Sequence, residues 1–357
     1  MNPLGILEKP TEWTYTEKYR GAGNFQIWLP LTVENVKLCS IGNLVWIKEK
    51  DAAMVIELIQ TETSTSGAKI MIQGYTLENI LSKRIVWGLY TKSDKPSILI
   101  EGLVNDQIVS PTNENRKYPN LAIENYQGDT SQEKSVQYQC TGNVLSSEVS
   151  SLCELYGYGY RVKFKSSLKS LTFSLYKGTD RGIKNGKVSP VVLSTDFENL
   201  LSSEYQSDHM SYKNVALVQG MGEGNDRTSV TINDEMSGNN RIELYVDARD
   251  LQNTDENGFE ISEEDYKELL TGRGNSMLNE SKIAENFSTE VNTLGNMQYN
   301  RDYFLGDIVT VQDRTLGLQL SALVSEVEHS YSTLGYSINI TFGYGQSTLI
   351  DKLRRRL

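Results

Sequence analysis

The sequence contains few of the residues that most often carry catalysis or bind metals. It has 2 histidines, His209 and His329, and 3 cysteines, Cys39, Cys140 and Cys153. Neither set has the short spacings that are typical of zinc sites. We therefore predict no metal site and no cofactor, and we expect surface or interface histidines together with reduced, partly buried thiols.

Long apolar runs are also missing. No segment approaches the roughly 20 consecutive apolar residues that a membrane-spanning helix needs. Residues 1–9 lack the basic region and the apolar core of a signal peptide. We therefore expect no stable membrane insertion, and synthesis in a cytoplasm. The 357 residues, 38% hydrophobic and 23% charged, are typical of a soluble protein with two or three domains.

Positive charge is scarce relative to negative charge. The chain has 35 Lys and Arg against 46 Asp and Glu, which gives a net charge of −11. Surfaces that bind nucleic acid depend on clustered Lys and Arg, so this composition argues against such a surface. The strongly basic stretch at residues 352–356 lies in a short basic C-terminal tail, residues 346–357.

The common catalytic motifs are absent as well. The sequence has no Gly-x-Ser-x-Gly elbow and no His-Glu-x-x-His zinc motif. The glycine-rich segment 220–224 lacks the Lys-Ser/Thr pair of a phosphate-binding loop, and Glu223 would repel a phosphate. We interpret this segment as a mobile turn between strands, and we predict no catalytic residue.

Carboxylates are abundant, and a glycosidase needs only two that face a cleft. Helix capping explains a first group, Glu263, Glu264 and Asp265. A solvated surface explains a second group, which consists of Asp247, Asp250, Asp255 and Glu256. The Tyr-Gly-Tyr-Gly-Tyr run at 156–160 is either a contact patch or part of a core. We favour the contact patch, because exposed aromatic residues are enriched at interfaces.

Two segments share one pattern of turns and strands. Residues 305–344 contain a Gly-Asp turn, an apolar strand, a middle strand, a glycine turn and an alternating strand that closes with Gly343-Tyr344. Residues 41–75 repeat this order from a Gly-Asn turn to Gly74-Tyr75. Apolar residues alternate along the later copy at Leu316, Leu318, Leu320, Ala322 and Val324, and at Ile338, Ile340 and Phe342. Such alternation buries one face of each antiparallel strand, so we predict two similar small β-barrels.

Other local patterns predict the elements around these copies. Residues 13–19 and 25–29 should form a hairpin, and Leu77, Ile80 and Leu81 have the spacing of a short helix. We expect extended structure at 98–104 and a strand at Val136–Cys140. Asn143 can cap a helix whose apolar stripe is Leu145, Val149, Leu152 and Tyr156.

The later part of the chain contains further strands and one strong helix start. We predict strands at 160–164 and 171–176, and we expect strands at 191–193 and 214–220 to begin the second barrel. Ser262-Glu263-Glu264-Asp265 matches a capping box at the head of a helix.

The predicted fold class is α+β and rich in β-strands, with two similar small β-barrels, an intervening small α+β domain and a helical insertion. The predicted boundaries are a first barrel at 1–110, a small α+β domain at 111–180, a second barrel at 181–234 and 291–345, an acidic helical insertion at 235–290, and the basic tail at 346–357.

Several motifs in this order resemble those of a known family. They are Gly42-Asn43-Leu44-Val45, the segment from Gly74-Tyr75 to Arg84-Ile85-Val86-Trp87, Tyr176-x-Gly178-x-Asp180-Arg181, residues 243–250, and residues 305–311. Together they are similar to the tail-tip, or baseplate, hub proteins of long-tailed phages, of the tail-associated lysin N-terminal module type. The resemblance covers nearly the whole chain.

The resemblance implies a homotrimeric ring that closes the distal end of the tail tube and opens for DNA ejection. Three subunits with two barrels each would match six-fold tail rings. The implied partners are the distal tail protein hexamer, the tape measure protein, and spike or receptor-binding proteins. DNA would pass through an acidic lumen without specific binding. The implied location is the virion tail tip, after assembly in the bacterial host cytoplasm.

Two other function classes remain open from the sequence. One is a tail-associated peptidoglycan hydrolase with a carboxylate pair that no motif reveals. The other is a receptor- or carbohydrate-binding tail protein that uses the acidic insertion or the tyrosine run. Because no enzyme signature is present, we expect a structural protein rather than an enzyme.

Overall fold

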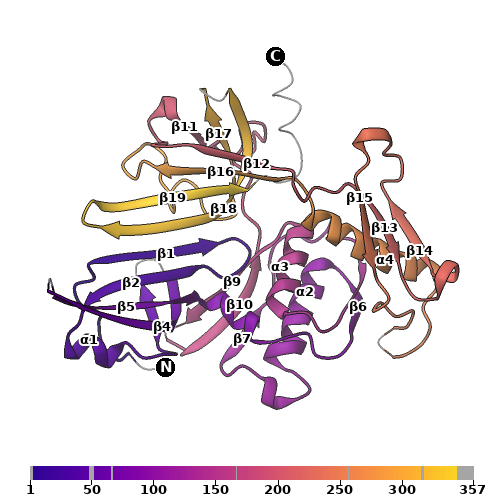
Figure 1. The fold of residues 1–357 in the computed structure, drawn as a ribbon, viewed down its shortest axis with the longest axis horizontal. Coiled ribbons are helices and arrows are strands. Elements are labelled where there is room, and N and C mark those ends of the chain that lie inside the picture. The colour runs from indigo at the N-terminus through magenta and orange to yellow at the C-terminus, as the bar shows by residue number, and fades with distance from the viewer. Residues whose placement is uncertain are drawn as a thin grey trace. The chain divides into compact units, whose positions relative to one another are not determined.

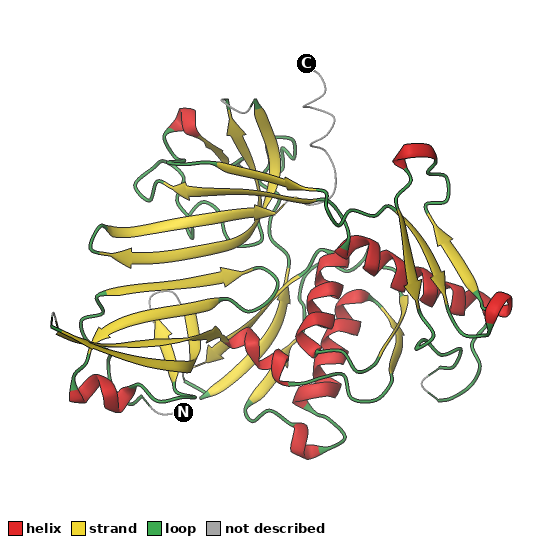
Figure 2. Ribbon diagram, in the orientation of Figure 1, coloured by secondary structure: helices red, strands yellow, loops and turns green. Residues whose placement is uncertain are grey.

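The structure, a computed structural model, describes residues 3–47, 52–65, 67–165, 167–255, 257–314 and 317–343. The chain divides into two compact units (Figures 1 and 2). Unit 1 comprises Met1–Asn79, Gly159–Gln206 and Glu285–Leu357, and unit 2 comprises Ile80–Tyr158 and Ser207–Ala284. Expectations for Glu256, for Leu316, for Tyr344 and for the basic tail at 346–357 lie outside the described residues.

Unit 1 is built on one 11-stranded sheet. Nine of its strands follow the order β12-β16-β19-β18-β1-β2-β5-β4-β3, while β17 pairs with β18 and β11 pairs with β17. The strands are β1 (Glu12–Lys18), β2 (Asn24–Pro30), β3 (Leu44–Ile47), β4 (Ala52–Ser64), β5 (Gly67–Thr76), β11 (Val192–Ser194), β12 (Glu204–Asp208), β16 (Ala284–Val291), β17 (Ile308–Asp313), β18 (Leu318–Ser332) and β19 (Gly335–Gly343). The predicted hairpin is confirmed as β1 and β2.

Short elements complete this unit. Helix α1 (Val33–Leu38) begins where the Thr32 hydroxyl accepts a hydrogen bond from the Asn35 backbone N–H. The 3-10 helices are Thr195–Phe197 and Leu77–Lys83; the latter confirms the predicted short helix and runs on into unit 2 from Ile80. Strands β9 (Gly159–Lys165) and β10 (Ser170–Tyr176) form an antiparallel pair, as predicted.

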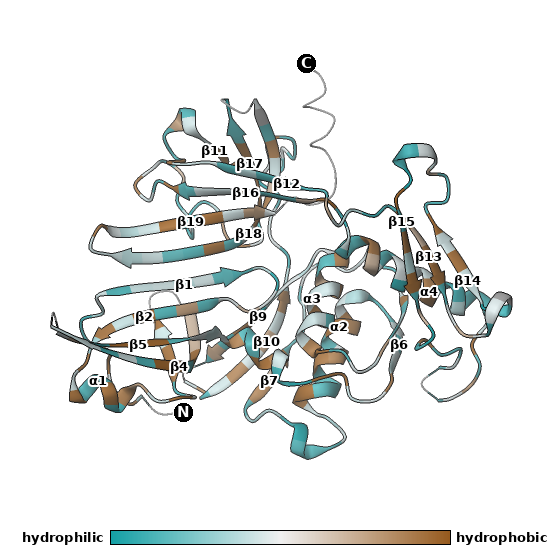
Figure 3. Ribbon diagram, viewed as in Figure 1, coloured by the Kyte–Doolittle hydropathy of each residue, from teal (hydrophilic) through white to brown (hydrophobic). Residues whose placement is uncertain are grey.

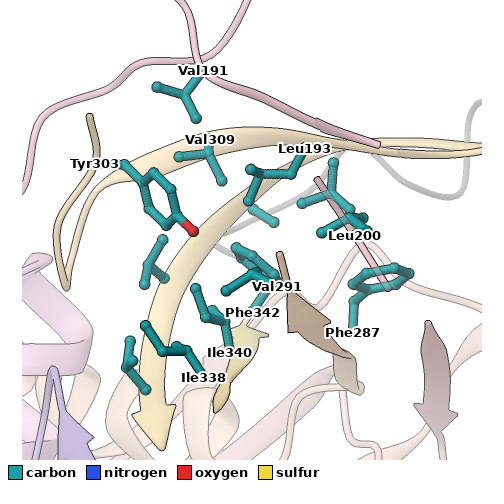
Figure 4. Packing of buried hydrophobic residues seen from close by; sticks show 14 residues of the cluster. Val191, Leu193, Leu200, Phe287, Val291, Tyr303, Val309, Ile338, Ile340 and Phe342 are labelled. Carbon is teal, nitrogen blue, oxygen red and sulfur yellow. The ribbon is translucent and has the colours of Figure 1, made fainter. Parts of the chain in front are cut away.

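Each half of the sheet covers its own apolar core, because alternate side chains of its strands point inward. Figure 3 shows the hydropathy of these strands along the backbone. The core of the first half includes Phe25, Leu29, Met54 and Ile72. The core of the second half includes Phe287, Val291, Ile340 and Phe342, which lie together in Figure 4.

Unit 2 contains the longer helices. They are α2 (Pro96–Val104), α3 (Leu145–Tyr156) and α4 (Glu263–Glu280). A π-helical turn, Asn105–Val109, continues α2, and 3-10 turns lie at Glu114–Arg116, Gly224–Asp226 and Gly238–Asn240. The strands are β6 (Tyr90–Asp94), β7 (Leu121–Glu124), β8 (Val136–Cys140), β13 (Val215–Gln219), β14 (Ser229–Ile232) and β15 (Glu243–Asp247).

Helix α4 and a three-stranded sheet share an apolar core in unit 2. The sheet has the order β14-β13-β15, and Val218 and Val246 pack with Leu270 of the helix. The predicted helix start at Ser262 is confirmed, since its hydroxyl accepts from the Asp265 N–H and donates to the Asp265 carboxylate. The expectation that 214–220 begins the second barrel is wrong, because β13 pairs with β14 and β15 instead. Segment 235–290 also holds β15 and most of β16, so it is only partly helical.

Two other local expectations are corrected. Residues 98–104 are helical in α2, where Pro96 occupies the first turn and Leu99, Ile100 and Leu103 are buried. A short apolar run is compatible with either a strand or a buried helix, and in this protein it forms the helix. The α3 N-cap is Val144 rather than Asn143, whose amide donates to the Glu148 carboxylate. The predicted class, α+β and rich in strands, is confirmed.

Two glycines of α4 give a matched test of packing. A Cβ on Gly274 would lie 2.4 Å from Ile232 and 2.5 Å from Val218, whereas a Cβ on Gly272 would have only one neighbour, at 3.9 Å. Both Ala substitutions gain about 1 kcal/mol of helix propensity. We expect Gly272→Ala to raise the free energy of unfolding, and Gly274→Ala to lower it because overpacking costs about 1–3 kcal/mol. Urea unfolding followed by circular dichroism measures both, and equal stabilisation by the two variants would contradict the packing.

Candidate assembly interface

The two halves of the unit 1 sheet are structural copies of each other. Strands β3, β4 and β5 form an antiparallel meander, and β17, β18 and β19 form another. Strand β2 then pairs with β5 as β16 pairs with β19 (Figure 1). The sequence repeat at 41–75 and 305–344 therefore corresponds to a repeat of topology over its described residues.

The same turn opens each copy. Gly42 has φ +86° and donates its N–H to the Ile56 carbonyl at 2.8 Å. Gly306 has φ +92° and donates to the Val324 carbonyl at 2.8 Å. A positive φ favours glycine, which explains why both copies begin with this residue. A β-bulge follows at once in each long strand, after Ile56 in β4 and after Val324 in β18.

The register corrects one detail of the sequence repeat. Gly74 pairs with Ile56, and the residue that pairs with the equivalent Val324 is Phe342, not Gly343. Gly74 therefore corresponds to Phe342, one position before the match between the two Gly-Tyr pairs. A Cβ on Gly74 would lie 1.8 Å from the Val55 carbonyl oxygen, so this position admits only glycine, whereas Phe342 fills the second core.

Two of the family-like motifs pack against each other in the second copy. The buried Asp307 carboxylate accepts from the Thr179 N–H at 2.7 Å and pairs with Arg181 at 2.8 Å. A Cβ on Gly178 would lie 1.9 Å from the Gly306 carbonyl oxygen, so the two backbones are in close contact. The motif at 176–181 thus anchors the turn that opens the second meander.

Strands β1 and β18 join the two halves. They pair antiparallel from Trp13 opposite Tyr331 to Lys18 opposite Glu326, where the side chains form an ion pair of 3.1 Å. The first half of β18, up to Leu323, pairs with β17. One long strand therefore serves both its own half and the neighbouring half.

An aromatic cluster fills this junction. His329 is fully buried, its ring stacks on Tyr15 at 4.5 Å between centroids, and its Nδ1 lies 2.6 Å from the Tyr336 hydroxyl. Burial raises the pKa of Tyr336 to about 12. The Glu17 carboxylate accepts from the Tyr299 hydroxyl at 2.7 Å and lies 3.9 Å from His329 Nε2. The sequence prediction of two surface or interface histidines is right for the exposed His209 and wrong for His329.

The outer edges of the two halves are open within the described residues. Strand β12 pairs with β16 alone. Strand β4 pairs with β3 only opposite Ala52–Val55, and no described strand pairs with its outer edge beyond that point. The equivalent part of β18 carries β1. Leu58 in this open part of β4 is 47% exposed. Open strand edges are templates for pairing with another chain.

The other candidate residues have structural roles. Arg227 donates to the Gly220 carbonyl at 2.9 Å, and segment 220–224 lies between β13 and β14 as predicted. Asp247 pairs with Arg227 and Arg249, and hydrogen bonds from these arginines hold its pKa well below the usual range. Asp250 pairs with Arg273, and Glu263 pairs with Lys267.

The tyrosine run is not the contact patch that we favoured. Tyr158 and Tyr160 are fully buried. The Tyr158 hydroxyl donates to the Glu133 carboxylate, and the Tyr160 ring packs against the Phe173 ring. Residues 158–160 are all buried where β9 begins, and Tyr156 is half-buried, which composition cannot distinguish from an exposed cluster. The three cysteines are buried, and burial raises the pKa of Cys140 to about 12, so its thiol is unreactive.

The described residues include no group of three or more His, Cys, Asp or Glu side chains that could hold a metal ion. No described helix has both the length and the apolar character to cross a membrane.

The model of the Siphovirus ReqiPepy6 Gp37-like protein family matches residues 1–344. The chain belongs to this family. No curated protein sequence matches the chain. The resemblance to a phage family that the motifs indicated is thus confirmed.

Solved structures of tail proteins share the fold. The tail protein from Neisseria meningitidis MC58 aligns with 94% of this chain and 92% of its own length, at 11% identity and a TM-score of 0.56. The 43 kDa tail protein of prophage MuSo2 from Shewanella oneidensis covers 94% of both chains at 12% identity and 0.55. Prophage tail protein gp18 from Listeria monocytogenes EGD-e covers 96% and 91% at 13% identity and 0.51. At these identities the likeness shows the fold, and that fold is the fold of phage tail proteins.

Tyr299 and Tyr303 give a matched test of the junction. Their rings lie 5.8 Å apart, but the Tyr299 hydroxyl donates to Glu17 while the buried Tyr303 hydroxyl has no hydrogen-bond partner in the described structure. We expect Tyr299→Phe to lower the free energy of unfolding by about 1.5–3 kcal/mol, the range for a hydrogen bond to a charged group. Tyr303→Phe should be neutral or stabilising, because it removes an unsatisfied buried hydroxyl. Thermal unfolding of the two variants tests this, and the opposite order would contradict the assigned contacts.

Proposed function

We propose that the protein is the hub of a siphophage tail tip, where three copies form a ring that closes the distal end of the tail tube. The observation that carries this proposal is the pair of similar half-sheets joined side by side by β1 and β18. Three chains with two halves each would present six similar units, which suits docking on a six-fold ring.

The junction within the chain suggests how the ring closes. Strand β1 of the first half lies on β18 of the second half. By the same repeat, β12 of the second half would lie on the open part of β4 in the first half of the next subunit. This pairing would satisfy backbone N–H and C=O groups at both open edges and extend the sheet around the ring.

The remaining parts of the proposal concern partners and passage. The ring would connect the distal tail protein hexamer, the tape measure protein and the spike or receptor-binding proteins, and it would open for DNA ejection. The net charge of −11 supports a lumen along which DNA slides without specific binding. We propose a structural rather than an enzymatic role, at the distal tip of the virion tail, after assembly in the host cytoplasm.

The size of the protein in solution tests the ring and its edges together. We expect light scattering after gel filtration to give three times the chain mass of 40.2 kDa for the protein alone, or a complex that holds three copies of the chain when the distal tail protein is added. At the dilution of gel filtration, Leu58→Glu should shift the protein to a monomer, because it adds a charge at the open edge of β4. The control is Leu168→Glu, at a residue that is 71% exposed in the turn between β9 and β10.

Either of two results would contradict the proposal. One is a chain that stays monomeric both alone and with the distal tail protein. The other is a trimer that Leu58→Glu leaves intact, which would remove the strand-edge contact.

A further inference from the structure

Unit 2 exposes an apolar strip around one tryptophan. Trp87 is 68% exposed, Ile85 is 40% exposed and Val144 is 39% exposed. Ile85 and Val144 pair in a β-bridge, so their side chains adjoin. We call the surface formed by Arg84, Ile85, Trp87, Arg116 and Val144 the Trp87 surface. A tryptophan so exposed is common at protein interfaces and uncommon elsewhere on a monomer.

A buried glutamine holds this surface in one conformation. Arg116 lies 5.5 Å from the centre of the Trp87 ring, and both of its terminal nitrogens donate to Gln107 Oε1 at 3.1 Å. Gln107 is 6% exposed and also accepts from the backbone N–H of Trp87 at 2.9 Å. Arg116 further donates to the Ile85 carbonyl at 2.7 Å. Hydrogen bonds therefore hold the guanidinium beside the Trp87 ring before any partner arrives, which lowers the entropic cost of binding.

The two arginines of this surface lack a countercharge. Arg84 Nε donates to the Arg116 carbonyl at 2.7 Å, and its Nη1 donates to the Lys83 carbonyl. Neither Arg84 nor Arg116 pairs with a carboxylate in the described part of the chain, although most arginines in it do. Burial and the charge of Arg84 lower the pKa of Arg116. The surface thus presents two adjacent positive charges in a chain of net charge −11.

A second exposed aromatic residue of unit 2 has the opposite surroundings. Phe259 is 71% exposed in a turn closed by a β-bridge between Thr254 and Glu260. The Asp255 carboxylate accepts from the Phe259 N–H at 2.9 Å and fixes the turn. The exposed Glu260 and Glu264 form no ion pair in the described structure, whereas the neighbouring Glu263 pairs with Lys267. We call Phe259, Glu260 and Glu264 the Phe259 loop.

We propose that the Phe259 loop of one copy docks on the Trp87 surface of a second copy. The Phe259 ring would cover the exposed indole and the apolar strip, and the two carboxylates would reach the two guanidiniums. Two arginines and an exposed indole on one side face two carboxylates and an exposed phenyl ring on the other. Within the described residues, neither pair of charged groups forms an ion pair in its own chain. The contact is heterologous, so it closes only in a ring or continues as a filament. It involves unit 2 residues alone and does not rest on the strand-edge contact.

Complementation between two variants tests this contact in the full chain. We use the Leu58→Glu background, in which the proposed strand-edge contact is switched off, and add either Trp87→Ala or Phe259→Ala. Neither variant should self-associate in sedimentation velocity. A mixture of the two should form a one-to-one complex, because the first variant keeps its Phe259 loop and the second keeps its Trp87 surface. The Leu58→Glu parent, which is monomeric at the dilution of gel filtration, should self-associate at the higher concentrations of sedimentation velocity, at least about 30-fold more tightly than either variant with itself, as expected for loss of an aromatic hot spot.

Charge variants and a surface control complete the test. Glu260→Arg together with Glu264→Arg should weaken association as Phe259→Ala does, whereas Met210→Ala, at a residue that is 94% exposed, should leave it unchanged. Circular dichroism confirms that each variant is folded. A mixture that stays monomeric, a parent that never associates, or a Met210→Ala effect equal to that of Trp87→Ala would overturn the inference. Failure of the strand-edge proposal appears separately, as a trimer that Leu58→Glu does not disrupt.

Discussion

The pairing of β1 with β18 is the contact on which the arrangement of unit 1 depends. Without it, each half would be a small sheet around its own core, with two open edges. With it, the halves share one hydrogen-bonded sheet, and Tyr15 and His329 are buried between them. A backbone ladder fixes the offset of two strands, and the buried aromatic rings fix which faces meet.

The bulge in each long strand explains how one strand can serve two neighbours. In β18 the bulge falls between Val324 and Glu326, at the point where pairing with β17 ends and pairing with β1 begins. A bulge adds a residue to one strand, bends it and increases its twist. The strand can therefore leave its own half and follow the next one. Because β4 has its bulge at the equivalent place, its second part is shaped for a neighbour as well.

Much of this architecture was predictable, because its signals are local. The positive φ at positions 42 and 306 favours glycine, so the turns are visible in the sequence. The alternation of buried and exposed positions along β19 appears in the sequence as apolar residues at every second position. The capping serine of α4 is equally local. These signals predicted the repeat, the strands and the fold class. They did not predict which strands join, so β13 was assigned to the wrong sheet.

The candidate interfaces were less predictable, because burial depends on packing between distant segments. The residues next to Tyr158 do not predict that its hydroxyl donates to Glu133. Likewise, the residues next to His329 do not predict that its ring stacks on Tyr15. Conversely, tryptophan is a large apolar residue type that is usually buried, yet Trp87 is exposed. These residues differ in whether other groups of the same chain contact and cover the side chain. Where it has, as in the β1–β18 junction, the contact stabilises the subunit. Where it has not, as at the outer edge of β4 and around Trp87, the same chemistry is available to a second copy.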